Sequence, residues 1–365
     1  MTIQLTWPQI LAWRLRRQFV SPAGGSDVVA VARRLCGVQA QVSSSARLAV
    51  AVRSAEPDPG AIDRALWHER TLVKTWIMRG TLHLLPSDEL AGYCAALATL
   101  RFWEKGSWQR GHGVTAAEIS AIIEAVPHAL GEQPLTREEL VEAVVQVTGD
   151  AHLRQALTSG WGALLKPLSR LGELCYGPPR DGRVTFVAPR RWLPGWGATL
   201  PPSEEAGVRL ARAYLGAHGP ATPEMFDTWL FGGVARKAVL KGWFRDLGPE
   251  LTEVGTDDGR TLLALTEQLD DLAVTRPSGE VHLLPGFDQY ILGAPRNLEP
   301  LIPAPVKPKV SRQAGWISPV VVHEGRVAGV WEPKNSRVAL ELFEDVPQEA
   351  LQTAVERIES LLAVE

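Results

Sequence analysis

The sequence predicts a mainly helical α+β fold in which short helices followed by a strand-turn-strand hairpin occur three times. Two observations support this prediction. Thr136 stands three residues before Glu139, which is the spacing of a capping box at the start of a helix. Asp181-Gly182 separates two short runs of strand-forming residues, and this dipeptide favours a hairpin turn. Helices followed by a hairpin are typical of the winged helix-turn-helix, so we predict three such motifs in tandem.

The first unit is predicted over residues 1–115. Apolar periodicity indicates its helices, and Arg79-Gly80 marks the turn between two short strands. The helices are expected at 7–19, 27–35, 44–54 and 61–69, and both strands within 72–85.

The second unit is predicted over 116–200 and the third over 201–275, with a linker rich in proline and glycine at Pro189–Pro202. In the second unit, a helix over 153–171 should end at Gly172, and the hairpin strands are expected at 173–177 and 183–187. The third unit should contain three helices, at 208–217, directly after the Thr222-Pro223 cap, and at 235–247. Two strands should follow them, at 251–254 and 261–265.

Residues 276–365 are expected to form a C-terminal β-hairpin and a closing helix among Pro-rich loops. His323-Glu324-Gly325 is predicted to be the tight turn of the last hairpin. The strands are expected at 281–284, 317–322 and 326–331, and the amphipathic helix at 347–362. Large aromatic residues are expected to fill cores, namely Trp13, Trp76, Trp161, Trp229 and Trp331.

The composition predicts a globular protein of the cytoplasm. The chain has 365 residues, of which 45% are hydrophobic and 22% charged. It contains no apolar run near the roughly 18 residues that span a bilayer, and no signal-peptide pattern. The three cysteines are far apart and form no C-x-x-C pair, so neither a disulfide framework nor a zinc site is indicated.

Charge is unevenly distributed along the chain, although the net charge is only −3. Two basic segments, Met1–Arg53 and Arg296–Arg337, contrast with an acidic last helix. The first contains seven arginines and a single acid, Asp27. A positively charged surface attracts phosphate, so these segments indicate contact with nucleic acid. The alternative is that they are ordinary solvated faces.

The candidate chemistry centres on Gln39-Ala40-Gln41. The eight histidines have no metal-binding spacing, and neither a P-loop nor a G-x-S-x-G elbow is present. A glutamine amide cannot act as a general base, but it can position an attacking water. That suffices only where the leaving group is already activated, as in a guanine that carries a positive charge after alkylation. If both glutamines act together, they should lie on an extended segment after Gly37; alternatively, Gln39 caps a helix and Gln41 is merely exposed.

Four segments together resemble the winged-helix DNA glycosylases of the azinomycin-resistance, or AlkZ-like, family. They are Gly37–Gln41, Met78–His83, Leu284–Asp288 and the hairpin that ends at Gly329–Trp331. The resemblance covers almost the whole chain. It implies three tandem winged helices in a C-shaped arrangement with a basic concave face. It also implies excision of bulky or crosslinked alkylpurines from DNA without a metal or other cofactor.

The resemblance further implies that Gln39 and Gln41 match the catalytic glutamines of that family. A related bacterial branch carries aspartate at the second position, so Gln41 places this chain with the narrower crosslink-resistance type. His83 and Asp288 lie in family segments and are expected either to support the site or to hold it together.

Other candidate residues concern DNA contact. We predict that the hairpin 320–331 probes a groove, with His323 and Arg326 at its exposed tip; alternatively, it is a plain hairpin. Further phosphate-contact candidates are Arg79, Lys74, Arg312, Lys334 and Arg337, for which plain solvation is the alternative.

The leading hypothesis is therefore a monofunctional DNA glycosylase that acts on bulky alkylpurines, including interstrand crosslinks, and serves self-resistance to an alkylating natural product. Its partner would be double-stranded DNA containing alkylated or crosslinked guanine, and the protein would be a monomer near the nucleoid of a bacterium. The alternatives are a winged-helix transcriptional regulator without catalysis, which should prefer an undamaged operator, and a protein-interaction module.

Overall fold

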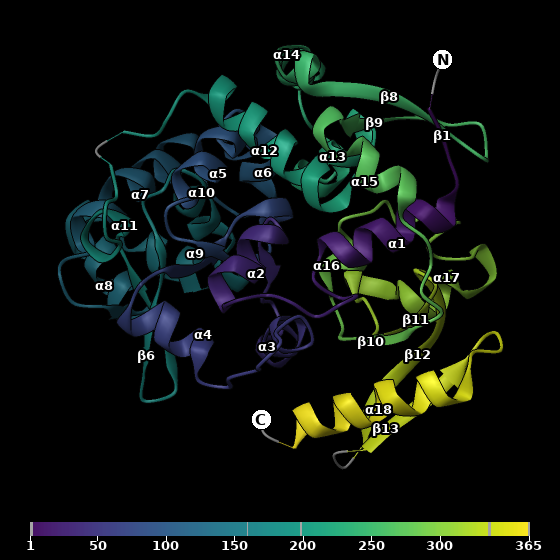
Figure 1. Ribbon diagram of the computed structural model, residues 1–365. Helices are drawn as coiled ribbons and strands as arrows, with labels where there is room; N and C mark the ends of the chain where they lie inside the picture. Colours follow the sequence, from purple (N-terminus) through teal and green to yellow (C-terminus); the bar gives the residue numbers. More distant parts are fainter. Residues whose placement is uncertain (1–2, 159, 198, 335–336, 364–365) are drawn as a thin grey trace.

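The computed structural model describes residues 3–158, 160–197, 199–334 and 337–363. Within these residues, three three-stranded sheets and one four-stranded sheet are distributed along a mainly helical chain (Figure 1). Each three-stranded sheet contains an antiparallel hairpin that follows a set of helices in sequence. We call these three assemblies the first, second and third repeats. The predicted mainly helical α+β class is confirmed.

The first repeat lies at the centre of Figure 1 and contains the glutamine pair. Asp27 begins its first helix, because the carboxylate accepts the Ala30 N–H at 2.7 Å. Gly37, with φ +100°, then turns the chain into a short strand. The elements are α2 (Val28–Arg34), β2 (Val38–Gln39), α3 (Ser43–Ala51), α4 (Ala61–Asp63), η1 (Arg64–His68), β3 (Leu72–Trp76), η2 (Met78–Gly80) and β4 (Leu82–Pro86), with sheet order β2-β4-β3.

The second repeat confirms both local predictions that opened the sequence analysis. Thr136 and Glu139 form the capping box, and Asp181 and Gly182 take positive φ values of 52° and 73° in the hairpin turn. The elements are α7 (Ala116–Ala129), β5 (Leu135–Thr136), α8 (Arg137–Thr148), α9 (His152–Thr158), η4 (Gly160–Leu165), α10 (Lys166–Arg170), β6 (Cys175–Arg180) and β7 (Arg183–Val187). The single helix predicted over 153–171 is wrong. It divides into α9, η4 and α10, because Gly162 has φ +75° and Pro167 has no N–H to donate.

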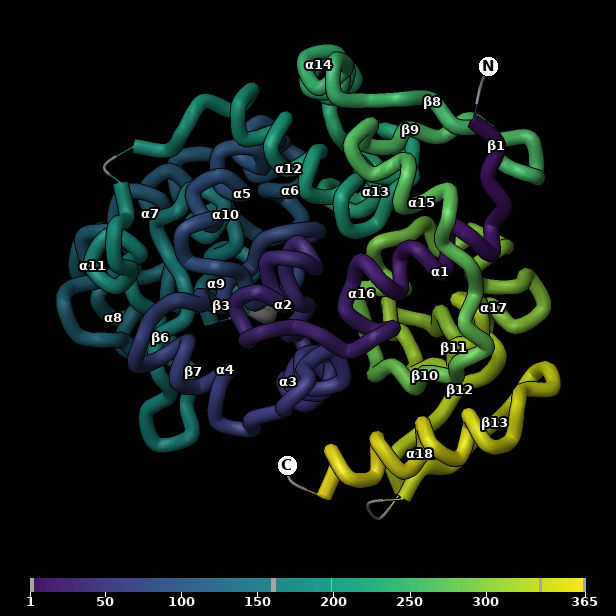
Figure 2. The backbone as a smooth tube through the Cα atoms, in the orientation of Figure 1, coloured from purple at the N-terminus to yellow at the C-terminus, as the bar shows by residue number. Residues whose placement is uncertain are grey.

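The third repeat includes an N-terminal strand that the sequence placed with the first unit. β1 (Ile3–Leu5) runs parallel to β8, and the following α1 (Trp7–Arg17) lies against the same part of the molecule (Figure 2). Trp7 and Val254 are both buried in one core, which explains why the N-terminus is held there. The other elements are α12 (Ser203–His218), α13 (Pro223–Phe231), α14 (Lys237–Leu247), β8 (Leu251–Thr256), β9 (Thr261–Leu265) and α15 (Leu269–Val274).

The C-terminal part forms one antiparallel sheet of order β10-β11-β12-β13, against which α18 packs. The predicted tight turn is confirmed, since Glu324 and Gly325 have φ values of 49° and 83°. It is not the last hairpin, because β12 continues beyond the predicted strand and pairs with β13. The elements are β10 (Val281–Leu284), α16 (Gln289–Leu292), α17 (Lys307–Val310), β11 (Val320–His323), β12 (Arg326–Lys334), β13 (Arg337–Leu342) and α18 (Gln348–Leu362).

Hydrophobic residues form three clusters, of which the largest joins the first and third repeats to the C-terminal sheet. Trp13, Trp76, Trp229 and Trp331 are buried as predicted, whereas the side chain of Trp161 lies outside the described residues. In the described part of the chain, no helix is long and apolar enough to cross a membrane. The remaining short elements are α5 (Leu90–Leu97), η3 (Phe102–Glu104), α6 (Gly106–Gly111), α11 (Pro189–Trp192), η5 (Gly248–Glu250), η6 (Thr266–Gln268), η7 (Ala304–Val306) and η8 (Gln313–Gly315).

Candidate active site

Gln39 lies on a short strand between two helices rather than on a helix. β2 pairs with β4 so that Gln39 stands directly opposite His83. The pairing continues for one more residue, because the Ala40 N–H donates to the Leu82 carbonyl at 2.7 Å. Directly opposite residues of two paired strands project to the same side, so Gln39 shares its face with His83. β2 ends at Gln39 and Gln41 lies in a bend, so the extended segment predicted after Gly37 is confirmed as far as Ala40, and a common face for the two glutamines remains a prediction.

Gln41 is exposed, whereas Gln39 is only 6% exposed. The Gln41 carbonyl accepts a long hydrogen bond from the Leu82 N–H, at 3.4 Å, and keeps a second lone pair free. Neither glutamine caps a helix. α2 has its C-cap at Leu35, and the N-cap of α3 is Val42, whose side chain makes no capping bond. The alternative in which Gln39 serves as a cap is therefore wrong.

His83 is fully buried and lies on β4, the central strand of the first sheet. Its Nδ1 lies 3.0 Å from the Thr81 carbonyl, to which it donates, and its Nε2 has no hydrogen-bond partner in the described chain. Burial, followed by the charge of Arg79, lowers the pKa of His83 to about 3. A neutral imidazole with a free acceptor nitrogen therefore lies on the Gln39 face of the sheet.

Arg79 connects the first repeat to the third. It takes a left-handed conformation, with φ 54°, in the turn between β3 and β4, and its guanidinium donates to the Trp229 carbonyl of α13. Burial, followed by the charge of Arg296, lowers the pKa of Arg79 to about 10. Arg79 was predicted to contact phosphate. In the structure, its guanidinium is buried and binds α13 of the third repeat.

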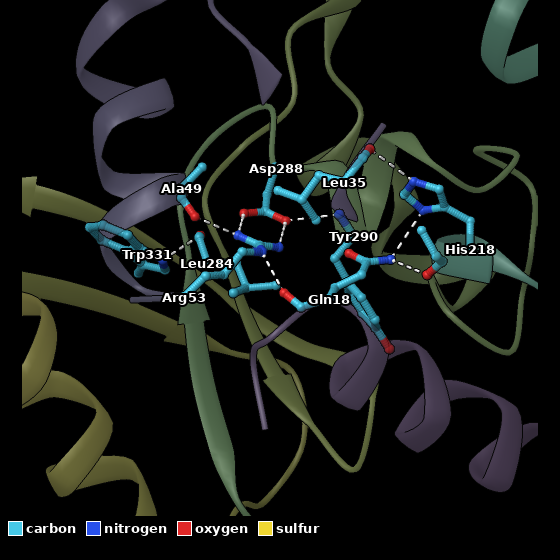
Figure 3. Close-up of polar contacts among 10 residues, drawn as sticks. Gln18, Leu35, Ala49, Arg53, His218, Leu284, Asp288, Tyr290 and Trp331 are labelled. Atoms are coloured by element: carbon cyan, nitrogen blue, oxygen red, sulfur yellow. Dashed lines mark hydrogen bonds and ion pairs between the residues drawn. The ribbon is translucent and has the colours of Figure 1, made fainter. Parts of the chain in front are cut away.

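Asp288 is fully buried and forms a two-bond ion pair with Arg53, which is also fully buried (Figure 3). The two N···O distances are 2.8 and 2.7 Å. Arg53 also donates to the carbonyls of Gln18 and Ala49, while Asp288 accepts the Tyr290 N–H at 2.8 Å. Asp288 thus holds α3 to the C-terminal part of the chain. Of the two expectations for this residue, the geometry matches a role in holding the structure together.

The same network reaches the segment before β2 through His218 of α12 (Figure 3). The Gln18 amide donates to His218 Nδ1 at 3.0 Å, and His218 Nε2 donates to the Leu35 carbonyl at 3.3 Å. Burial lowers the pKa of His218 to about 3, so this ring is neutral. Leu35 stands four residues before Gln39, and the network therefore fixes the chain just upstream of the glutamine pair.

The arginines of the opening segment do not form a uniform positive surface, which corrects the prediction from charge counting. Arg14 is 3% exposed and donates to the Pro220 carbonyl at 2.9 Å. Arg33 pairs with Asp88 and Glu89, and Arg47 pairs with Asp63. These acceptors come from later parts of the sequence, so a count over the first 53 residues misses them.

The hairpin of β11 and β12 is also more enclosed than predicted. Arg326 is exposed and His323 partly exposed, but Gly325 between them is buried. Its carbonyl accepts the Tyr290 hydroxyl at 2.5 Å, and an added Cβ would lie 2.4 Å from Leu11 Cβ of α1. The turn thus contacts α1 through Gly325, while Glu324 and Arg326 stay exposed. Contact of its two flanking side chains with DNA remains a prediction.

The other predicted DNA contacts lie in different places. Lys334, the last residue of β12, pairs with Arg337, the first residue of β13; the Arg337 side chain is 82% exposed and pairs with Glu359 at 3.2 Å. Arg312 is exposed in the loop that follows α17. These three bases are accessible, and only Arg337 has a carboxylate partner within the described chain.

Lys74 lies on the face of the first sheet opposite to Gln39, because it pairs with Leu84 rather than with His83. Its ammonium contacts the Ser43 hydroxyl at 3.2 Å. Burial, followed by the charge of Arg47, lowers the pKa of Lys74. The structure therefore does not bring Lys74 together with the glutamine pair.

Two further side chains were not singled out from the sequence. Trp316 is 45% exposed, and its ring contacts Phe287 edge to face at 5.0 Å. Besides burial, the charge of Arg296 lowers the pKa of Arg79. A guanidinium nitrogen of Arg296 would lie 3.9 Å from a Cβ added at Gly315. Nothing local in the sequence distinguishes Trp316 from the other twelve tryptophans.

One small cavity, of about 190 Å³, is lined by Ala40 but by neither glutamine. A cavity of about 1550 Å³ lies among α2, α3, α12 and α18, and neither glutamine lines it. Among the residues that the structure describes, no group of three or more His, Cys, Asp or Glu side chains is arranged to hold a metal ion.

Comparisons with known proteins agree with one another. The family model of AlkZ-like DNA glycosylases matches residues 32–363. The chain is 44% identical over 344 residues to an interstrand DNA cross-link repair glycosylase of Streptomyces sahachiroi, covering 94% of this chain and 92% of that protein. The solved structure of the Streptomyces sahachiroi DNA glycosylase AlkZ superimposes with a TM-score of 0.93 and 41% identity, covering 99% of this chain and 98% of the other. The chain belongs to the AlkZ-like DNA glycosylase family.

Proposed function

We propose that this protein is a monofunctional DNA glycosylase that hydrolyses the N-glycosidic bond of bulky alkylated purines, including interstrand crosslinks. The similar Streptomyces protein is named for cross-link repair. The observation that carries the proposal is the Gln39-Ala40-Gln41 segment, extended as far as Ala40, beside a neutral histidine. The Gln39 amide makes no hydrogen bond within the described chain, so it is free to bind a water.

In the proposed reaction, the two glutamines orient one water toward C1′ of the damaged nucleotide. The C1′–N9 bond breaks and its electron pair neutralises the positively charged alkylated purine. The water oxygen then bonds to C1′ and releases a proton to solvent, which leaves an abasic site. An amide cannot remove that proton as a strong base does. The mechanism therefore demands a leaving group that already carries positive charge, which limits the substrates to alkylated purines.

The exposure of Gln41 supports attack on a lesion that remains in the duplex. Ordinary glycosylases rotate the target nucleotide into a closed pocket. A base tethered to the opposite strand cannot make that movement. Gln41 is exposed, and the cavity of about 1550 Å³ is lined by neither glutamine. An open site of this kind suits a crosslinked substrate, and resistance to a DNA-alkylating natural product is the corresponding proposed biological role.

Accessible bases supply the proposed phosphate contacts. Arg312, Lys334 and Arg337 are the main candidates, with Arg326 and His323 beside the docked turn. Arg79 and Lys74 are weaker candidates, because burial lowers the pKa of each. The protein would bind double-stranded DNA as a monomer, with little sequence preference. Its affinity should then fall steeply with salt.

The decisive experiment is excision from duplexes that carry a single N7-alkylguanine or an interstrand crosslink, followed by alkaline cleavage at the abasic site. Gln39→Ala and Gln41→Ala should each lower the single-turnover rate by about 100-fold or more, as loss of a preorganised polar group does. Gln155→Ala, which changes an exposed amide on α9, is the matched control and should retain the full rate.

Full excision by both glutamine variants would overturn the catalytic assignment. Absence of excision by the unaltered protein, together with tight binding of one undamaged sequence, would instead favour a winged-helix regulator without catalysis.

A further inference from the structure

We propose that His83 is a positioning residue for Gln39: its unpartnered Nε2 accepts a hydrogen bond from the Gln39 amide NH₂ and so turns the Gln39 carbonyl toward the attacking water. This inference rests on the proposed catalytic function of Gln39. It assigns a function to a polar atom that is sealed within the sheet and has no partner in the described residues.

The register of the sheet places the two side chains together. Gln39 and His83 are directly opposite each other on β2 and β4. Because the Ala40 N–H donates to the Leu82 carbonyl at the next pair, Gln39 and His83 form a pair without backbone hydrogen bonds of its own. Side chains approach most closely at such pairs, with Cβ atoms roughly 4.5–5.5 Å apart. A small rotation of the glutamine chain therefore brings its amide to the imidazole.

The hydrogen bonding of His83 fixes which nitrogen can accept. Its Nδ1 faces the Thr81 carbonyl at 3.0 Å, and a carbonyl only accepts, so Nδ1 carries the proton. In the neutral ring, Nε2 then holds a lone pair and no proton. Burial keeps the ring neutral, since the pKa of His83 is about 3. This nitrogen can accept a hydrogen bond from an amide NH₂ but cannot donate one to an amide oxygen.

The orientation of the amide matters for the chemistry. A glutamine amide can present either its oxygen or its NH₂ to a bound water, and the two ends have nearly the same shape. Only the oxygen can accept a water proton and direct the water lone pair toward C1′. An acceptor on one side of the amide selects the productive orientation. Gln39 itself has no other hydrogen-bond partner within the described chain that would make this choice.

A sealed acceptor without a donor destabilises a folded protein, and replacing it by an apolar group of similar shape removes that cost. The Thr81 carbonyl would remain satisfied after such a change, because it also accepts the Ile77 N–H at 3.1 Å. A purely structural role for His83 and a positioning role therefore predict opposite combinations of stability and rate.

The test is His83→Phe in the full-length chain, assayed on an N7-alkylguanine duplex. We expect the single-turnover excision rate to fall roughly ten-fold or more, with DNA affinity unchanged and Tm equal to or above that of the parent. His83→Gln, whose side-chain carbonyl reaches the position of Nε2 and can accept the same hydrogen bond, should recover part of the rate. His282→Phe alters a strand histidine of the C-terminal sheet and should leave the rate unchanged.

A double variant shows whether His83 acts through Gln39. In a Gln39→Ala background, His83→Phe should cause no further loss of rate. An equal loss in both backgrounds, or a parental rate in His83→Phe, would refute the inference. If Gln39→Ala itself retained full activity, the proposed catalytic function would fail, which is a distinguishable result.

A second measurement covers the case in which His83→Phe does not fold. The nitrogen resonances of ¹⁵N-labelled histidine report whether Nε2 accepts a hydrogen bond. On binding of a duplex with an abasic site, the His83 Nε2 resonance should move in the parent and stay in place in Gln39→Ala. Identical behaviour of the two proteins would contradict the positioning role.

Discussion

The first and second repeats place the same elements in the same order, yet they differ where the short strand meets the next helix. Gln39 and His83 are paired in the first sheet as Thr136 and Thr185 are in the second. In the second repeat, Thr136 ends the strand and at once caps α8 through a capping box. In the first, three residues separate β2 from α3, and its N-cap makes no side-chain bond.

This difference separates a pair of residues whose polar groups have local partners from a pair whose polar groups remain available. Thr185 donates to the Pro178 carbonyl at 2.7 Å, so both members of the second pair have local partners. His83 has a buried nitrogen without a partner, and the Gln39 amide makes no hydrogen bond within the described chain. Buried atoms without a partner also occur in the second repeat, on Ser169 and Arg170, so the lack of a partner does not by itself mark a site. What distinguishes the first repeat is that its unpartnered nitrogen belongs to a residue directly opposite a glutamine with a free amide.

The largest expected effect concerns the ion pairs of the two repeats. Arg53 and Asp288, which anchor α3, are both 0% exposed, whereas Arg154 and Glu142 of the second repeat are about half exposed. Removing one partner of a buried pair leaves an uncompensated charge. Asp288→Asn should therefore lower the free energy of unfolding by about 3–5 kcal/mol, measured by urea denaturation. Glu142→Gln is the control on the surface and should leave Tm unchanged.

Equal effects of the two substitutions would contradict the view that the first repeat depends on the C-terminal part. The excision activity of Asp288→Asn should decrease in proportion to the fraction of protein that is no longer folded. A folded Asp288→Asn variant with no activity would give Asp288 a direct part in the site.

A second expected effect is loss of stability in acid, to which one buried histidine of the first repeat and one of the third repeat contribute. The pKa values of buried His83 and His218 are lowered to about 3, below the value of about 6.5 in an unfolded chain. As pH falls below 6.5, the unfolded chain therefore binds protons that the folded protein rejects. Each ring should reduce the free energy of unfolding by about 1.4 kcal/mol per pH unit between pH 6 and pH 4.

Urea midpoints at pH 7, 6 and 5 measure this slope. His83→Phe should reduce the slope by the contribution of one imidazole ring. Thr185→Val, at the equivalent position of the second sheet, should leave the slope unchanged. An unchanged slope in His83→Phe would show that His83 takes up its proton in the folded state.

The sequence predicted those parts of the fold that depend on neighbouring residues. The Thr136 capping box and the Asp181-Gly182 turn needed only their own few residues to be recognised. The burial of Arg53 was missed because its partner Asp288 is 235 residues away. The burial of His83 was missed for a similar reason, since it lies on the central strand of a sheet whose outer strands come from separate parts of the sequence. Long-range pairing, rather than local propensity, decides which polar residues become available for chemistry.

The smallest expected effect comes from exchanging the helix starts of the two repeats. Thr136→Val removes the capping hydroxyl of α8 and should lower the free energy of unfolding by about 1 kcal/mol. Val42→Thr offers α3 the cap that it lacks and should raise stability by up to about 1 kcal/mol. Both changes are measurable as shifts in urea midpoint at pH 7, with Gln155→Ala as the neutral control.

The excision rate of Val42→Thr sharpens the comparison further, because this residue directly follows Gln41. A threonine hydroxyl at position 42 would accept a hydrogen bond from a backbone N–H in the first turn of α3, as Thr136 does for α8 in the second repeat. If free polar groups at this junction matter for excision, the variant should be more stable and slower. A variant that is more stable and equally fast would limit the functional difference between the repeats to the Gln39–His83 pair and Gln41, and would separate the start of α3 from the chemistry.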